Sequence, residues 1–284
     1  MAQFVVLIIV VLTALASTLI GNFLVLRRLS LMGDAISHAI LPGIIFAFFI
    51  AGSLESPLFF IFSILFAILM VFVIEYFSHN LKVSQESVIG IVFTALFALG
   101  VILLVNFADN VHLDQDAVLY GQAEFSYINR FVIFGMDLGV RSLWTMGFSL
   151  VLNAVMITLF YKELKLTTFD PGLAKSLNIS VRKMHYLIMT LTSITVVAAF
   201  EAVGAILVVA FLVVPAATAY IVAKRLGVMI ALSLVFAGLS AIFGYVLAIN
   251  VDGSIAGAAA LMSGVIMFLV FGGWKIYSKV NRYF

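Results

Sequence analysis

The sequence contains no cysteine and few charged residues. The absence of cysteine excludes disulfide bonds and thiolate metal ligands. Charged residues make up 10% of the 284 residues, whereas a soluble domain carries about 25%. The net charge is only +2, so the composition indicates no nucleic-acid partner. With 65% hydrophobic residues and a mean hydropathy of +1.27, the chain is predicted to be a membrane protein.

Several catalytic motifs are also absent. The chain has no G-x-x-x-x-G-K-[ST] phosphate loop, no H-E-x-x-H zinc-protease helix and no G-x-S-x-G nucleophile elbow. Only four histidines are present, so the chain has few candidate catalytic residues for an intramembrane hydrolase. We therefore expect a chain that is not an enzyme and does not itself hydrolyse ATP through a phosphate loop.

Long runs free of Asp, Glu, Lys and Arg occupy most of the chain. A spanning helix needs roughly 20 mostly apolar residues, and continuous runs do not fit the alternating pattern of a membrane barrel. The runs therefore predict an all-α, polytopic membrane protein with a single transmembrane domain over 1–284. The first run has no basic residues before it, which favours an uncleaved span over a signal peptide. The nine runs are 1–26, 35–54, 56–74, 87–108, 142–161, 184–200, 202–223, 226–251 and 253–274.

The number of spans depends on the segment 184–225. It reads either as two helices or as one span followed by a broken or re-entrant piece, so eight or nine spans are expected. Gly204 and Pro215 are the candidate breaks, because proline removes a backbone donor and kinks helices.

The basic residues predict the orientation. If the N-terminus lies outside and nine spans alternate, all Lys and Arg residues except Arg130 and Arg141 fall in internal segments. The outer segments collect acidic residues instead. The positive-inside rule then places the C-terminus in the cytoplasm.

An acid and an imidazole occur together in the apolar stretch SLMGDAISHAIL, residues 30–41. Asp34 and His38 are four residues apart and share one helical face. A buried carboxylate costs at least about 2.5 kcal/mol in a membrane, so such residues usually face a pathway or a partner. Both side chains are ligands for divalent transition metals. A structural pair, with Asp34 as a helix cap, and a proton relay are the alternatives.

Four other residues are weaker candidates for a pathway. Ser37 lies between the two predicted ligands and is a candidate third ligand. Pro42, followed by Gly43, would kink the helix and open space beside the pair. Glu201 lies near the outer end of a span and would meet either a passing cation or water. Pro215 would shape the pathway as a helix break.

The internal loop at about 162–183 carries a helix signal. Thr168 or Asp170 can cap a short helix that has Pro171 at its first position. Such a helix is either a docking element for a soluble partner or part of a solvated basic loop. In the outer loop, His112, Asp114 and Asp116 alternate, but an EF-hand pattern is missing, which favours a solvated acidic loop over a metal site.

Three stretches resemble the membrane permease subunits of bacterial ABC importers for manganese, zinc and iron. They occur in the family's order and at fitting separations, so the resemblance covers essentially the whole chain. The first stretch is highly specific and the other two moderately so. The stretches are VLRRLSLMGDAISHAILPG (25–43), LKLTTFDPGLAKSLNIS (164–180) and VGAILVVAFLVVPAATAY (203–220).

The resemblance implies a location in the bacterial cytoplasmic membrane and three partners. These are a second permease subunit, either a copy or a related chain, a cytosolic ATP-binding subunit and an external metal-binding protein. It makes Asp34 and His38 pathway residues for a transported ion, with no cofactor bound permanently. It also implies that the internal loop couples to the ATPase, through Thr168, Phe169, Asp170, Pro171, Leu173 and Ala174.

The sequence therefore predicts the permease subunit of an ATP-driven importer of divalent metal ions. Mn²⁺ is the expected ion, and Zn²⁺ or Fe²⁺ the alternatives. A secondary transporter that exchanges protons for metal at Asp34 and His38 is the second hypothesis. A membrane scaffold or sensor without transport is the third.

Overall fold

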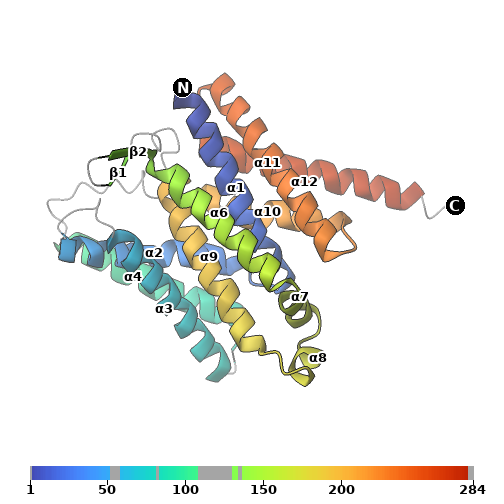
Figure 1. Ribbon diagram of the computed structural model, residues 1–284, viewed down its shortest axis with the longest axis horizontal. Helices are drawn as coiled ribbons and strands as arrows, with labels where there is room; N and C mark the ends of the chain where they lie inside the picture. The colour runs from blue at the N-terminus through green and yellow to red at the C-terminus, as the bar shows by residue number, and fades with distance from the viewer. Residues whose placement is uncertain (1, 52–57, 81–82, 108–129, 134–135, 281–284) are drawn as a thin grey trace.

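The computed structural model describes residues 2–51, 58–80, 83–107, 130–133 and 136–280. Within these residues the chain forms nine long helices, two short helices and one two-stranded hairpin (Figure 1). The elements are α1 (Ala2–Leu26), α2 (Ser30–Ala51), α3 (Leu58–Asn80), α4 (Gln85–Phe107), β1 (Arg130–Ile133), β2 (Met136–Val140), α6 (Arg141–Leu159), α7 (Tyr161–Phe169), α8 (Pro171–Ser176), α9 (Val181–Val203), α10 (Ala205–Val222), α11 (Leu226–Val251) and α12 (Ile255–Val280).

The nine long helices are each long and apolar enough to cross a membrane. Of the two expected span counts, the described part of the chain supports nine. The segment 184–225 forms two helices, and Gly204 separates them with a φ of 83° that an L side chain rarely adopts. Pro215 lies inside the continuous helix α10, so the break expected there is wrong. Helices packed on several sides can compensate for the missing backbone donor of a proline.

A short hairpin precedes α6 in the predicted outer loop. Strand β1 pairs antiparallel with β2, so that Arg130 lies opposite Val140, and the ladder is irregular between Arg130 and Val132. The all-helical prediction missed this hairpin, because four and five residues are too short for a clear alternating pattern. Helix α6 begins directly after β2, so the hairpin leads straight into the bundle.

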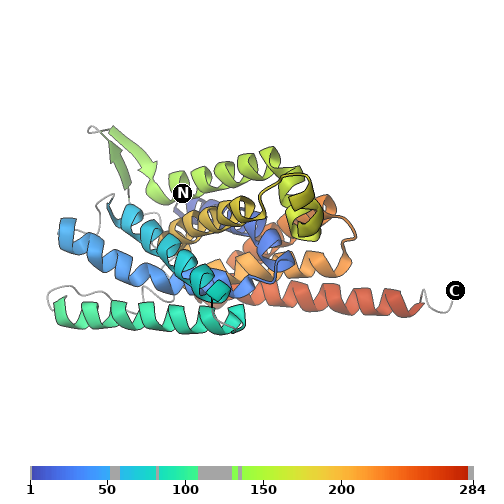
Figure 2. The same ribbon diagram turned by 90° about the horizontal axis from the view of Figure 1, so that it is seen from below.

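Helix α1 is the centre of the bundle and packs against α6, α9, α10 and α11. Helices α2, α3 and α4 pack together on one side of this centre, and α11 packs on α12 on the other (Figure 1). Figure 2 shows the same division, with α2 and α4 at one end and α12 extending beyond the opposite end. The described chain is therefore one continuous helical bundle built around its first helix.

Three helices meet closely at Leu212 of α10. A Cβ added to Gly21 on α1 would collide with the backbone carbonyl of Leu212. A Cβ added to Gly33 on α2 would lie 2.7 Å from a methyl carbon of the Leu212 side chain. Small residues allow this approach, which is how helices gain packing energy where the hydrophobic effect between them is weak.

Hydrogen bonds between polar side chains join the central helices inside the bundle. Asn22 of α1 donates to the Ser233 hydroxyl of α11 at 2.8 Å. Asn153 of α6 donates to the Thr195 hydroxyl of α9 at 2.8 Å. The Thr18 hydroxyl donates to the carbonyl of Phe211 at 2.7 Å. Each bond satisfies a buried donor that would otherwise be costly in an apolar interior.

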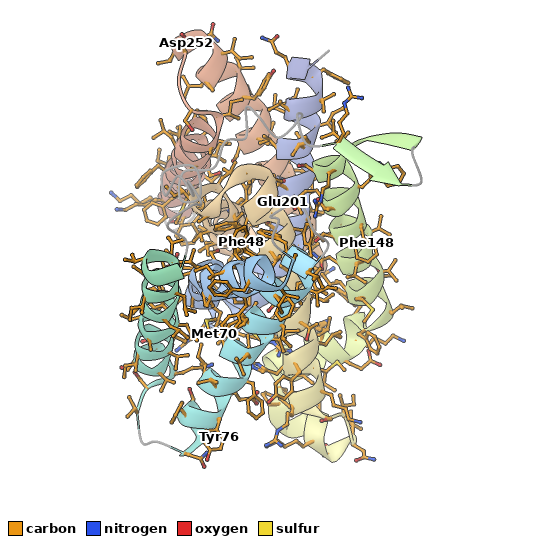
Figure 3. All side chains as sticks on the ribbon, turned by 90° about the vertical axis from the view of Figure 1, so that its left-hand side faces the viewer. Phe48, Met70, Tyr76, Phe148, Glu201 and Asp252 are labelled. Carbon is orange, nitrogen blue, oxygen red and sulfur yellow. The ribbon has the colours of Figure 1, made fainter. Side chains whose placement is uncertain are left out.

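The outer faces of the bundle are apolar. Phe148 projects from α6 and is 65% exposed, whereas Met70 of α3 is fully buried (Figure 3). Large apolar side chains are exposed on most of the long helices. A soluble protein rarely exposes so much contiguous apolar surface, but lipid chains cover such a surface in a membrane.

The contact at Gly21 gives a test of the packing. Gly21→Ala places a methyl group against the Leu212 backbone, so we expect it to destabilise the chain by about 1–3 kcal/mol. Gly238→Ala on α11 is the matched control, because its Cβ has no heavy atom within 4 Å. Thermal unfolding of the purified chain in detergent measures both. Equal midpoints for the two variants would contradict the close α1–α10 contact.

Candidate metal site and coupling segment

The two predicted metal ligands lie together on α2. Nε2 of His38 is 3.5 Å from Oδ1 of Asp34, which confirms that they share one face. Two donor atoms that each lie ~2.1 Å from one ion, at a tetrahedral angle, are about 3.4 Å apart. The observed separation is therefore compatible with one shared divalent cation, and the metal role itself stays a prediction.

The surroundings of the two side chains differ. The His38 ring packs against Phe93 and Phe97 of α4, with ring centroids 5.4 and 5.2 Å away. The side chain of His38 is 24% exposed and that of Asp34 is 47% exposed. Aromatic packing therefore positions the imidazole, while the carboxylate stays accessible to an ion.

Ser37 lies beside the pair, but its hydroxyl hydrogen is already used. The residue is buried, and its hydroxyl donates to the carbonyl of Gly33 at 3.0 Å. Only the oxygen lone pairs remain available to another partner. Among the described residues, no group of three or more His, Asp and Glu side chains could hold a metal ion. The pair thus supplies two ligands, and water or another chain would have to fill the remaining coordination positions of an ion.

Pro42 and Gly43 lie in a closely packed part of α2. Helix α2 continues through Pro42, and this residue is buried. A Cβ on Gly43 would lie 2.8 Å from the carbonyl oxygen of Phe62, so α3 packs directly on this position. Gly43 thus serves a close contact with α3, and the expectation that the segment opens space beside Asp34 and His38 stays a prediction. A pathway role of Pro42 or of Pro215, which is buried in α10, stays a prediction.

Glu201 forms an ion pair at the end of α9. Its Oε1 lies 3.4 Å from Nε of Arg141, the first residue of α6. Both side chains are largely buried, with 17% and 16% exposed. The Arg141 guanidinium also lies over the ring of Phe60, 4.9 Å from its centroid. This pair explains why Arg141 is one of the few basic residues outside the predicted internal segments.

The predicted capped helix in the internal loop is present. Helix α7 ends at Phe169, and Asp170 accepts a hydrogen bond on Oδ1 from the backbone of Leu173 at 2.9 Å. Pro171 is the first residue of α8, where the missing N–H costs nothing. Asp170, rather than Thr168, is therefore the cap.

The predicted coupling segment, residues 168–178, exposes apolar side chains. Phe169 is 58% exposed, Leu173 is 48% exposed and Leu177 is 59% exposed. Ala174 is fully buried and faces the bundle. Exposed apolar groups on and beside the short capped helix α8 form a surface that suits a protein partner. A contact role for Ala174 would be indirect.

Arg27 joins this segment to α1. In the sequence alone, it is only one of the basic residues that predict the orientation of the chain in the membrane. Its Nε donates to the Thr168 hydroxyl at 3.0 Å, and Nη2 donates to the Thr167 hydroxyl at 2.9 Å. Burial lowers the pKa of Arg27 to about 10, so the guanidinium stays charged at neutral pH. The residue lies 140 positions from Thr167, so no local spacing in the sequence could reveal the contact.

The end of α1 directs Arg27 toward α7. Arg28 adopts a left-handed conformation with a φ of 59°. The backbone of Leu29 bonds to Leu24 at 2.8 Å, and that of Arg28 bonds to Val25 at 3.1 Å, which is the Schellman pattern. Helix α2 then begins at Ser30. A tight turn therefore connects Arg27 to the helix that carries Asp34 and His38.

The acidic outer loop with His112, Asp114 and Asp116 lies outside the described residues. Its interpretation as a solvated loop stays a prediction.

The fold and the pair on α2 define a multi-pass helical membrane protein with ionisable residues in an apolar helix. The family model described as the ABC 3 transport family matches residues 2–273. The chain therefore belongs to the ABC 3 transport family.

Relatives are similar over most of their length. The manganese transport system membrane protein MntD of Bacillus subtilis is 44% identical over 255 residues, which cover 90% of this chain and 86% of the relative. The zinc transport system membrane protein TroD of Treponema pallidum is 42% identical over 266 residues, or 94% of this chain and 72% of the relative. Among solved structures, PsaBC from Streptococcus pneumoniae in complex with Fab matches with a TM-score of 0.78 and 31% identity, covering 94% of this chain and 89% of that one.

The buried ion pair gives a test of what Glu201 does. Arg141→Met leaves the Glu201 carboxylate buried without its partner, so we expect a loss of on the order of 3 kcal/mol in stability. The double variant Arg141→Met with Glu201→Gln removes both charges and should recover much of that loss. Thermal unfolding in detergent measures the variants. If the double variant is no more stable than the single one, the pair is not a structural unit.

Proposed function

We propose that this chain is the membrane permease subunit of an ATP-driven importer of divalent transition-metal ions in the bacterial cytoplasmic membrane. The observation that carries the proposal is the pair of Asp34 and His38, 3.5 Å apart on α2, in a chain of the ABC 3 transport family. Neither residue is held in a charged partnership with Lys or Arg among the described residues. The pair is therefore available to a transported ion.

The pair suits capture followed by release. A carboxylate oxygen and an imidazole nitrogen bind a divalent ion, but two ligands leave most of the coordination sphere to water. Attraction between the ion and the carboxylate is stronger in an apolar setting than in water. Release then requires that water enters or that one ligand turns away. Asp34, which is the more exposed of the two, is the ligand better placed to do so.

Two further chains complete the transport site and supply the ion. A second permease subunit, either a copy or a related chain, would bring its own ligands to the pathway. An external metal-binding protein would deliver the ion on the outer face. Mn²⁺ is the proposed ion, because hard oxygen ligands suit it and several relatives are named as manganese transport proteins. Zn²⁺ and Fe²⁺ remain the alternatives, because relatives named for zinc and chelated iron also match.

A separate cytosolic ATP-binding subunit would supply the energy, since the chain has no phosphate loop. The exposed side chains of Phe169 and Leu173 would dock this subunit. Arg27 would then transmit its movement, because it binds Thr167 and Thr168 and precedes α2 by a single tight turn. A push on α7 would reach Asp34 and His38 on α2 through these contacts.

Uptake of radioactive Mn²⁺ by vesicles that contain the assembled transporter tests the pair. Asp34→Asn and His38→Gln each remove a ligand with little change in volume, so we expect uptake to fall by at least ~10-fold. Asp252→Asn is the control, because this exposed carboxylate lies at the left-handed end of α11, where asparagine is well tolerated. Normal uptake in both pair variants would contradict the metal site. Uptake driven by a proton gradient without ATP would favour the secondary transporter instead.

The Arg27 contacts predict a coupling defect. Thr167→Val with Thr168→Val removes both hydroxyl acceptors at nearly constant shape, whereas Thr167→Ser with Thr168→Ser keeps them. We expect the valine variant to transport several-fold less metal for each ATP hydrolysed, because charged hydrogen bonds of about 1.5–3 kcal/mol are lost. The serine variant should retain the native ratio. Co-purification of the ATP-binding subunit with the valine variant confirms that docking is intact. The same metal-to-ATP ratio in all three proteins would contradict a role of Arg27 in coupling.

A further inference from the structure

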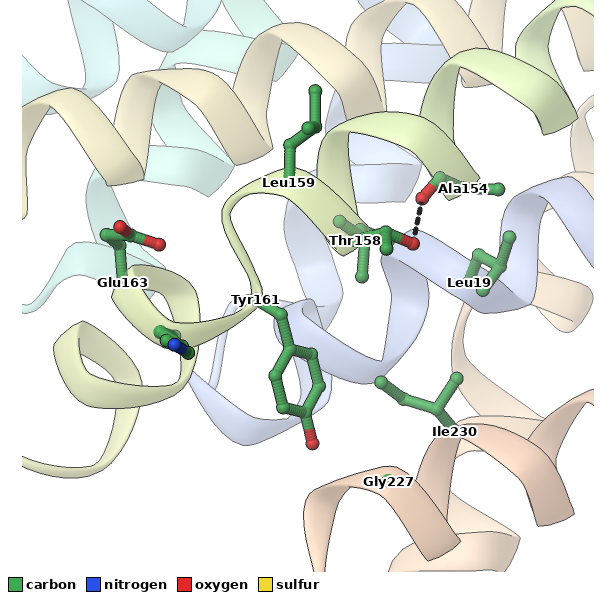
Figure 4. Close-up of a pocket in the computed structure, with 10 residues that line it drawn as sticks. Leu19, Ala154, Thr158, Leu159, Tyr161, Glu163, Gly227 and Ile230 are labelled. Carbon is green, nitrogen blue, oxygen red and sulfur yellow. Dashed lines mark hydrogen bonds between the residues drawn. The ribbon is translucent and has the colours of Figure 1, made fainter.

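A groove between α6 and α11 is lined by none of the residues proposed to bind metal. Both helices pack on α1, and Leu19 of α1 lies at the floor between them. The groove holds a cavity of about 700 Å³ lined by Thr158 and Leu159 of α6, Tyr161 and Lys162 of α7, and Ile230 of α11 (Figure 4). The Thr158 hydroxyl is bonded back to Ala154, so it does not fill the space.

A second cavity of about 600 Å³ adjoins the first. The two share Tyr161 and Gly227, and the second is also lined by Lys165, Lys224 and Arg225. Together with Lys162, four exposed cations surround this groove, against the single acid Glu163. None of the four cations is paired with a carboxylate among the residues that the structure describes. The groove is therefore a concave site with a strong excess of positive charge.

The apolar walls of the groove continue along both helices. Leu159, which lines the cavity, ends an exposed stripe with Val151 and Val155 on α6. Val228, which lines the second cavity, begins a similar exposed stripe with Val235 and Leu239 on α11. The basic rim thus lies at one end of two apolar faces, which is the arrangement that an amphiphile requires.

We propose that this groove binds an anionic phospholipid of the inner leaflet. The phosphate of the headgroup would sit among Lys162, Lys165, Lys224 and Arg225, and the acyl chains would lie along α6 and α11. Basic pockets between helices on the cytoplasmic side of a membrane bind anionic headgroups in this way. The location in the inner leaflet rests on the proposed function, which places α7 and α8 on the cytosolic side of the membrane.

The site also touches the predicted coupling machinery. Tyr161, Lys162 and Lys165 belong to α7, which Arg27 binds at its other end, while Lys224 and Arg225 precede α11. A bound headgroup would bridge these two elements. Anionic lipid would therefore hold α7 against α11 and steady the segment on which the ATP-binding subunit docks.

Native mass spectrometry of the purified full chain in detergent tests the site. The probes are phosphatidylglycerol and phosphatidylcholine with identical acyl chains. We expect the chain to retain phosphatidylglycerol at least ~10-fold more than phosphatidylcholine. Replacing Lys162, Lys165, Lys224 and Arg225 with glutamine should abolish this preference. Lys275→Gln with Lys279→Gln near the end of α12 is the control and should keep it.

Several outcomes would overturn the proposal. The first is equal retention of the two lipids by the native chain. This comparison does not depend on whether any variant folds. The second is displacement of phosphatidylglycerol by millimolar inorganic phosphate, which would identify a site for free anions. The third is a four-glutamine variant that keeps the lipid preference but loses the ATP-binding subunit, which would identify a protein-docking face. The assay measures lipid binding and not transport. Its result therefore does not depend on whether the chain imports metal ions.

Discussion

The contact of Leu212 with Gly21 and Gly33 sets the relative positions of three helices. Because neither glycine has a side chain, α10 approaches α1 and α2 at the same level of the bundle. Asp34 directly follows Gly33, so this contact also fixes where Asp34 and His38 lie. Helix α1 in turn packs against α6 and α11 and forms the floor of the groove between them. The proposed metal pair, the predicted coupling segment and the basic groove thus all depend on the packing of the first helix.

Three of the ionisable groups in this apolar bundle differ in the partners that they have. Glu201 is largely buried and lies 3.4 Å from the opposite charge of Arg141. Arg27 is bound by two neutral hydroxyls, which hold its charge in place at a junction between helices. Asp34 is the most exposed of these groups, and its closest charged neighbour is an imidazole that can itself bind metal. This contrast is the physical reason to propose cation binding at Asp34, whereas a pathway role of Glu201 stays a prediction.

Much of the fold could be predicted from residue patterns. Apolar runs near the length of a membrane span identified the long helices, and Asp170 with Pro171 identified the short helix α8. The hairpin before α6 was missed, because such short strands give almost no periodic signal. Pro215 was misjudged, because neighbouring helices decide whether a proline interrupts a transmembrane helix.

The sequence by itself determined that Asp34 and His38 share one face, because that relation depends only on the pitch of an α-helix. It also determined that the chain carries no G-x-x-x-x-G-K-[ST] phosphate loop. Only the tertiary structure decided that Arg27 holds Thr167 and Thr168 and that Arg141 neutralises Glu201. Those residues lie far apart in the chain, and their contacts arise from how glycines and buried polar groups let the helices pack. Local periodicity carries no information about such packing.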